Sequence, residues 1–279
     1  MKKISKPTYT VEDVLDLLIP TIRDEDFRNR YTSSKALIVA AESNYDSKGA
    51  ESELYVIEEA DSIGGVSSQE ASNFYTNSFI RKTGPTRHIY DALRLGAPNN
   101  ICPFCNHRVV KTLDHHLLKA FHPALTVTPL NLVPACRDCN LDLPIRRPRL
   151  SSEQVLHPYY HDVDDGVWLK SEIVEGRPPT VKFFVEPPIA WPEVKKAMVR
   201  NHFEVFKLSE LYSIHAGVEL IPTYSELKRL AEKGGDLKQH LLEKSEDRRA
   251  SGLNTWQAAL FQGLAESDWF CNVGYQYIH

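Results

Sequence analysis

The sequence predicts an α+β fold in which a small ββα metal module lies between mainly helical regions. Four of the five cysteines form two C-x-x-C pairs, and two short β-prone runs lie between these pairs. On both sides of this part, apolar residues recur at the three- to four-residue spacing of amphipathic helices. We expect a helical N-terminal region over 1–95, the metal module over 96–150 and a C-terminal α+β region over 151–279.

The N-terminal region carries three helical patterns. Thr10 can cap a first helix, in which apolar residues recur from Val11 to Leu18 at helical spacing. Two further helices are expected over 67–82 and 85–97, and the second of them ends at a glycine.

The C-terminal region begins with a β-hairpin around 166–188, where two alternating apolar runs flank a turn. Helical patterns then return, with a break expected at Gly234–Gly235. The expected helices cover 193–208, 209–221, 224–250 and 254–270.

The charge of the chain is segregated. The net charge is −4, but residues 81–150 have 11 Lys/Arg against 4 Asp/Glu, a net of +7, so the remainder carries −11. Residues 42–70 hold eight acids and one lysine, which we interpret as a solvated face. The net charge taken alone argues against a general nucleic-acid binder, but the basic part coincides with the cysteine-rich part.

The sequence shows no targeting or membrane-spanning pattern. Asp13 and Asp16 interrupt the first apolar stretch, which argues against a signal peptide. No apolar run approaches the ~18 residues of a membrane-spanning helix. We therefore expect a soluble cytoplasmic protein without membrane contact, in which paired cysteines bind zinc instead of forming disulfides.

The paired cysteines predict one structural zinc ion. A C-x-x-C pair bends the backbone so that both thiolates can face one tetrahedral ion, and two pairs leave no open coordination position. A segment of 30 residues separates the pairs, so zinc would join the two ends of an insertion. The expected ligands are Cys102, Cys105, Cys136 and Cys139, and Cys271 is interpreted as a small buried apolar residue.

The insertion and the residue after it supply groups for a second metal. Asp114 and Asn140 offer the oxygen ligands that Mg²⁺ prefers. A neutral histidine near such an ion, as His115 would be, can take a proton from water. This combination is typical of metal-assisted phosphodiester hydrolysis.

These residues resemble the HNH endonuclease family, whose members carry a zinc-stapled ββα-metal nuclease module. The resemblance rests on four motifs in order: C-x-x-C at 102–105, LDHHLLK at 113–119, NLVPAC at 131–136 and CRDCN at 136–140. It implies that Asp114 is a metal ligand, that His115 is the general base and that Asn140 is the second metal ligand. It also implies that Asn131 orients the base and braces the hairpin.

The module departs from the family pattern at two places. Many relatives have an aromatic residue where His116 stands, so we interpret His116 as structural. Many also have a lysine shortly after the last motif, whose phosphate contacts we assign to three arginines instead. The expected substrate contacts are Lys119, Arg137, Arg146, Arg147 and Arg149.

The adjacent positions of Asp114 and His115 lead to one structural expectation. Neighbouring residues of a strand point to opposite faces. For both side chains to serve one phosphate, the strand must bend or bulge at this position.

The expected function is that of a metal-dependent HNH endonuclease that hydrolyses DNA, with structural zinc and catalytic Mg²⁺ or Mn²⁺. The flanks resemble bacterial HNH proteins of anti-phage defence, which implies a role in defence or restriction beside an ATPase or another defence partner. Two alternatives stay open. In the first alternative, the substrate is RNA, for example tRNA. In the second, the module binds nucleic acid without cleaving it.

Overall fold

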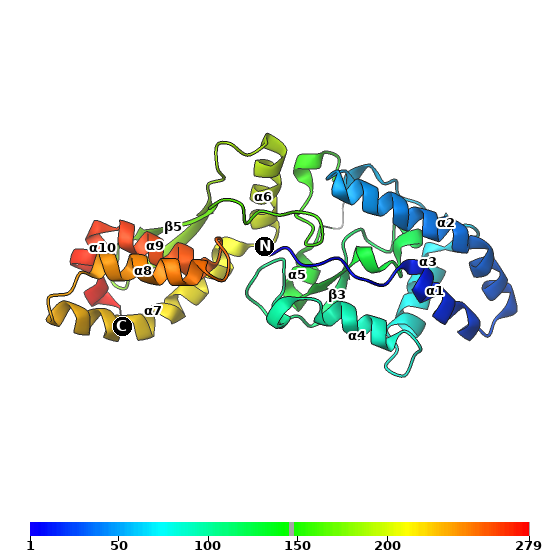
Figure 1. The fold of residues 1–279 in the computed structure, drawn as a ribbon, viewed down its shortest axis with the longest axis horizontal. Coiled ribbons are helices and arrows are strands. Elements are labelled where there is room, and N and C mark those ends of the chain that lie inside the picture. The colour runs from blue at the N-terminus through cyan, green and yellow to red at the C-terminus, as the bar shows by residue number, and fades with distance from the viewer. Residues whose placement is uncertain (145–147, 279) are drawn as a thin grey trace. The chain divides into compact units, whose positions relative to one another are not determined.

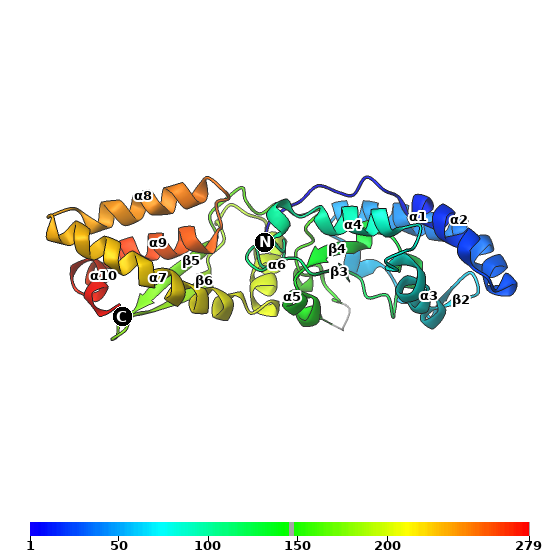
Figure 2. The same cartoon turned by 90° about the horizontal axis from the view of Figure 1, so that it is seen from below.

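The structure is a computed structural model that describes residues 1–144 and 148–278 (Figures 1 and 2). The chain forms two compact units, Met1–Asp162 and Val163–His279. The residues expected for the helical N-terminal region and for the metal module both lie in the first unit. The predicted α+β class is confirmed, because helices predominate and the described strands form two-stranded antiparallel sheets. Among the described helices, none is long and apolar enough to cross a membrane.

Two helices of the first unit begin where capping residues precede apolar side chains. Thr10 and Asp13 form a capping box at the start of α1, and Ser67 and Glu70 form another at the start of α3. α3 continues directly into a π-helical turn over Tyr75–Phe79. In chain order, the helices of this unit are α1 (Val11–Leu18), α2 (Glu25–Ala50), α3 (Ser68–Phe74), α4 (Arg87–Leu95) and α5 (Arg137–Asp142).

Two short antiparallel sheets accompany these helices. Strands β1 (Ser62–Ile63) and β2 (Val66–Ser67) form a small hairpin before α3. Strands β3 (Thr112–His115) and β4 (Leu132–Ala135) pair over four residues each. Figure 1 shows β3 and α5 beside each other within this unit.

The core of the first unit joins the helices to the β3–β4 hairpin. Apolar side chains from α1 to α4 form one buried cluster with Leu113, Val127 and Leu132, which come from the hairpin and its loop. Burial of one such leucine contributes about 1.5–3 kcal/mol. The hairpin is therefore built on a helical core.

The second unit confirms the hairpin predicted around 166–188. Strands β5 (Leu169–Val174) and β6 (Thr180–Val185) pair antiparallel, and α9 and α7 pack on them (Figure 2). The Asn254 side chain accepts a hydrogen bond from the Trp168 N–H at 2.8 Å and fixes the start of β5. The helices are α6 (Glu193–Val205), α7 (Leu208–Glu232), α8 (Leu237–Arg249), α9 (Trp256–Glu266) and α10 (Asp268–Asn272).

One helix boundary in this unit is wrong in the sequence-based prediction. We expected two helices separated near Pro222, but α7 runs through this proline without interruption. Proline removes the hydrogen bond to the carbonyl of Val218, four residues earlier. Val218 is 62 % exposed, so water can solvate that carbonyl. The break expected at Gly234–Gly235 is confirmed between α7 and α8.

Candidate active site

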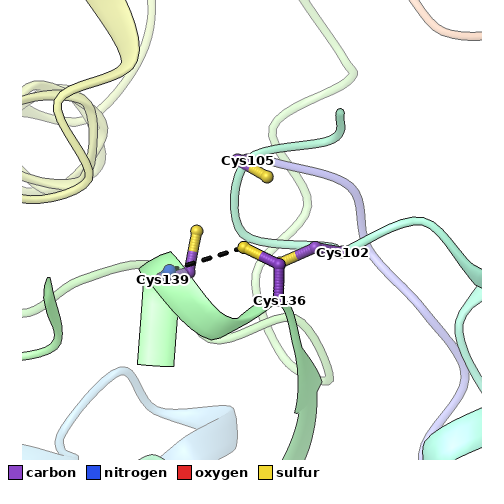
Figure 3. Close-up of side chains that lie close together, drawn as sticks. All are labelled: Cys102, Cys105, Cys136 and Cys139. Atoms are coloured by element: carbon purple, nitrogen blue, oxygen red, sulfur yellow. Dashed lines mark hydrogen bonds between the residues drawn. The ribbon is translucent and has the colours of Figure 1, made fainter. Parts of the chain in front are cut away.

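The four cysteines of the two C-x-x-C pairs converge in the first unit (Figure 3). All four are buried, and their sulfur atoms lie within 4.8 Å of one another. In a tetrahedral site with Zn–S bonds of ~2.3 Å, neighbouring sulfurs are about 3.8 Å apart. The cluster therefore has the composition and the size of a four-cysteine structural zinc site.

Local hydrogen bonds shape both cysteine turns. The Arg108 N–H donates to Cys105 Sγ, and the Cys139 N–H donates to Cys136 Sγ, each at 3.4 Å. Hydrogen bonds among the crowded thiols lower the pKa of Cys105 below its ordinary range and lower the pKa of Cys136 to about 7. They raise the pKa of the other two thiols. Four thiolates at this distance would need a bound cation, and zinc is the ion that suits four sulfur ligands.

The cluster also fixes the hairpin relative to α5. Cys136 follows β4 directly and is the N-cap of α5, so one ligand belongs to the junction of strand and helix. α5 has six residues, too few for a helix that is stable alone. Arg108 and Asp138 form an ion pair at 2.9 Å between the two turns, but both side chains are partly exposed and the pair contributes little. A metal ion bound by the cluster would therefore fix the position of Asn140 on α5.

Asn131 braces the loop that joins β3 to β4. Its side chain is fully buried, with Oδ1 accepting from the Leu117 N–H at 2.7 Å. The Nδ2 group donates to the Leu117 carbonyl at 2.9 Å and to the Leu125 carbonyl at 3.2 Å. These three bonds connect the two ends of the loop. The bond to Leu125 also fixes the position of the next residue, Thr126.

The ring of His115 is held in one tautomer. Its Nε2 lies 2.8 Å from the Thr126 carbonyl oxygen. A carbonyl oxygen only accepts hydrogen bonds, so Nε2 carries the proton and Nδ1 keeps a lone pair. Burial, together with the charge of Lys119, lowers the pKa of His115 to about 4. The imidazole is therefore neutral at pH 7 and can accept a proton at Nδ1.

Asp114 is a buried carboxyl group with an unsatisfied oxygen. It is 6 % exposed, and Oδ2 has no hydrogen-bond partner among the residues that the structure describes. Burial raises the pKa of Asp114 to about 8, and a hydrogen bond from the His115 backbone opposes this shift. A buried carboxylate without a partner is costly, and a divalent cation removes this cost. Asp114 therefore fits a metal ligand.

The expected bend in the strand is not found. Asp114 pairs with Val133 and His115 with Leu132, in a regular register without an inserted residue. The predicted bulge is therefore wrong. β3 ends at His115, so its pairing with β4 stays regular up to the residue where the loop begins. Within residues 1–144 and 148–278, no hydrogen bond joins the side chains of Asp114, His115 and Asn140 to one another. One hairpin–helix module carries all three.

Tyr75 is a residue of the site that the sequence did not reveal. Its ring lies 4.6 Å from the ring of His115, in an edge-to-face arrangement. Lys119 Nζ lies 4.8 Å from the centre of the same ring. Burial, with smaller contributions from Tyr90 and Asp114, raises the pKa of Tyr75. Tyr75 begins the π-helical turn, and such turns have no signature in a single sequence.

The expected substrate residues occupy different environments. Lys119 is half-buried beside Tyr75, and Arg137 and Arg149 are exposed. Arg146 and Arg147 lie outside the described residues. The ring of His116 packs 4.1 Å from the ring of His157, which agrees with our structural interpretation of His116.

The fold and the cysteine cluster define a mixed α+β protein with a four-cysteine metal-binding module. No family model and no solved structure matches this chain. The chain is similar to "Protein ea31" of Escherichia phage lambda, with 26 % identity over 234 residues. The match covers 79 % of this chain and 78 % of the phage protein, so the likeness includes the cysteine-rich module and most of its flanks.

Replacing Cys102 or Cys139 with serine removes one zinc ligand, and we expect loss of zinc together with a lower melting temperature. Zinc binding contributes on the order of 10 kcal/mol to folding in small zinc modules. Cys271→Ser is the matched control, because this thiol lies near the Leu264 carbonyl, outside the cluster. Elemental analysis and thermal denaturation measure both effects. One zinc per chain and an unchanged melting temperature in Cys102→Ser would contradict the four-cysteine site.

Replacing Asp114 with asparagine should stabilise the protein in buffer without added Mg²⁺, and increasingly so at higher pH. The folded-state pKa is about 8 against an ordinary value of 3.8, so the folded protein favours the neutral carboxyl group. The neutral carboxyl group makes its full contribution to the free energy of unfolding below about pH 4. This contribution is lost as the pH rises to about 8, at a rate of at most about 1.4 kcal/mol per pH unit. Asparagine does not ionise and escapes this loss.

Urea unfolding at several pH values within this window measures the difference. The exposed Asp61→Asn is the control, because it removes a carboxyl group from the surface and not from the interior. A pH-independent difference between Asp114→Asn and the unmodified protein would show that the carboxyl group is not buried as described.

Proposed function

We propose that the chain is a metal-dependent HNH endonuclease that hydrolyses phosphodiester bonds in DNA. The observation that carries this proposal is the pair of adjacent groups on β3. One is a histidine held in a single tautomer by the Thr126 carbonyl, and the other is a buried carboxyl group with an unsatisfied oxygen. A general base beside a ligand for a hard cation is what metal-assisted hydrolysis requires.

His115 would take the proton from the attacking water at Nδ1. The Nε2–H bond to the Thr126 carbonyl supports the positive charge that the ring then acquires. Asn131 acts through this carbonyl, because it holds Leu125 and thereby the neighbouring Thr126. Lys119 and His115 both contact the ring of Tyr75, so an ammonium group lies near the candidate base and would contact the phosphate there.

Asp114 and Asn140 would hold Mg²⁺ or Mn²⁺. When bound, such an ion stabilises negative charge on the scissile phosphate and on the leaving oxygen. The unsatisfied Oδ2 of Asp114 is the structural feature that fits this ion. The resemblance to HNH nucleases implies products with a 5′-phosphate and a 3′-hydroxyl.

The biological setting is part of the same proposal. The resemblance of the flanks to bacterial HNH proteins supports a role in anti-phage defence or restriction, with an ATPase or another protein as partner. The charge distribution supports the need for a partner, since the acidic remainder of the chain carries −11 and repels nucleic acid from most of the surface.

Replacing His115 with alanine should reduce cleavage by about 10²–10⁴-fold, which is the usual contribution of a general base. Zinc content should not change, because His115 is not a ligand of the four-cysteine site. The exposed His88→Ala is the matched control and should cleave like the unmodified protein. Plasmid DNA and total RNA are incubated with each protein, with and without Mg²⁺ or Mn²⁺. Equal cleavage by His115→Ala, or cleavage that needs no divalent ion, would rule out this mechanism.

A further inference from the structure

Helix α7 of the second unit carries apolar side chains on two of its sides. One side is buried, and α7 packs on β6 (Figure 2). On another side, Ile214, Val218 and Ile221 are 61 %, 62 % and 57 % exposed. Single exposed apolar residues are common on protein surfaces, but these three recur at spacings of four and three residues and so share one side of the helix. A continuous apolar surface of this kind is typical of a contact with another protein surface.

Gly217 lies in the middle of this exposed side. A Cβ atom at this position would meet no other atom within 4 Å, and the backbone there is not left-handed. Neither crowding within the chain nor backbone conformation therefore requires glycine. Glycine in the middle of a helix lowers its stability relative to alanine. What the missing side chain provides is room for a side chain of a second helix at close approach.

Opposite charges lie at the two ends of the same side. Glu210 lies one helical turn before Ile214, Lys228 lies two turns after Ile221, and both charged residues are exposed. At 3.6 residues per turn, these four residues and Gly217 fall within about 60° of the helix circumference. We call this set the α7 stripe and define it by Glu210, Ile214, Gly217, Ile221 and Lys228.

The α7 stripe is complementary to itself in the antiparallel direction. When a two-fold axis passes near Glu219, Glu210 of one copy lies opposite Lys228 of the other copy, and this ion pair occurs twice. In the same register, Ile221 of each copy lies opposite Gly217 of the other copy. A parallel pair would instead place each charged residue opposite its own equivalent, with like charges in contact. Charge and shape therefore favour the same antiparallel arrangement.

We propose that the α7 stripe binds a second copy of this chain, so that two α7 helices pair antiparallel across a two-fold axis. This inference does not depend on the proposed nuclease function. The stripe is about 27 Å long, and a contact of this length and about 10 Å in width is smaller than the ~800 Å² per partner of a standard interface. The dimer is therefore weak and forms at micromolar and higher protein concentrations.

The mass of the full-length, zinc-loaded protein tests this proposal. Sedimentation equilibrium from low micromolar to near-millimolar concentration should show a rise from the mass of one chain to that of two. Ile221→Glu puts a carboxylate into the contact without a partner and should raise the dissociation constant by more than about tenfold. Leu37→Glu is the matched control and should dimerise normally, since Leu37 is 52 % exposed and lies on α2.

Charge reversal tests the antiparallel direction. Glu210→Lys and Lys228→Glu, made in separate proteins, each place like charges in contact twice and should raise the dissociation constant by about tenfold or more. An equimolar mixture of the two variants should dimerise again, because every charged residue of one variant then lies opposite an unlike charge of the other. Both effects should become smaller at high salt, since exposed ion pairs are screened.

Circular dichroism of every variant checks that helix content is unchanged, because all three substitutions on α7 are at exposed positions. A monomer at all concentrations would overturn the proposal, since the stripe would then be covered by another part of the chain or by a different protein. A dimer that withstands Ile221→Glu and both charge reversals would also overturn it. Single charge variants that stay monomeric when mixed would exclude the antiparallel pair, and recovery of the dimer in the mixture would support it.

Discussion

The constraint on which the candidate site depends is the convergence of four cysteine sulfurs within 4.8 Å of one another. The segments that they join are individually weak: two strands of four residues and a helix of six. Structures of this size are marginal in water without further support. One zinc ion bound to all four thiolates would close the 30-residue insertion and hold Asp114 and Asn140 in a single module.

A second set of interactions, the hydrogen bonds of Asn131 and His115, orders the loop between β3 and β4. Asn131 satisfies both polar ends of its buried amide with the backbone of the loop, and this places the Thr126 carbonyl against His115. His115 therefore has a defined tautomer, with the proton on Nε2, and its ring is buried. Burial also raises the pKa of Asp114 to about 8 and leaves one of its oxygens without a partner. The proposed function assigns different tasks to these two neighbours on β3, proton transfer to His115 and cation binding to Asp114.

The sequence predicted the cysteine cluster because C-x-x-C spacing acts locally and forces both thiols to one side of a turn. It predicted the β5–β6 hairpin and the starts of α1, α3 and α9 for the same reason, since caps and periodicity are short-range signals. It missed α2, the longest helix described, because the apolar residues of α2 do not gather on one face. The place of Tyr75 beside His115 was not predictable, because the two residues come from segments that are distant in the chain. The uninterrupted α7 was missed because tolerance of Pro222 depends on solvent exposure, which a sequence does not record.

The central claim is that the four-cysteine site holds the hairpin and α5 in place. Hydrogen–deuterium exchange of the zinc-loaded and zinc-depleted protein, followed by mass spectrometry, tests it most directly. The account predicts that peptides covering residues 102–142 lose protection when zinc is removed, while peptides from β5 to α9 in the second unit keep theirs. Unchanged protection of β3, β4 and α5 in the zinc-free protein would contradict it.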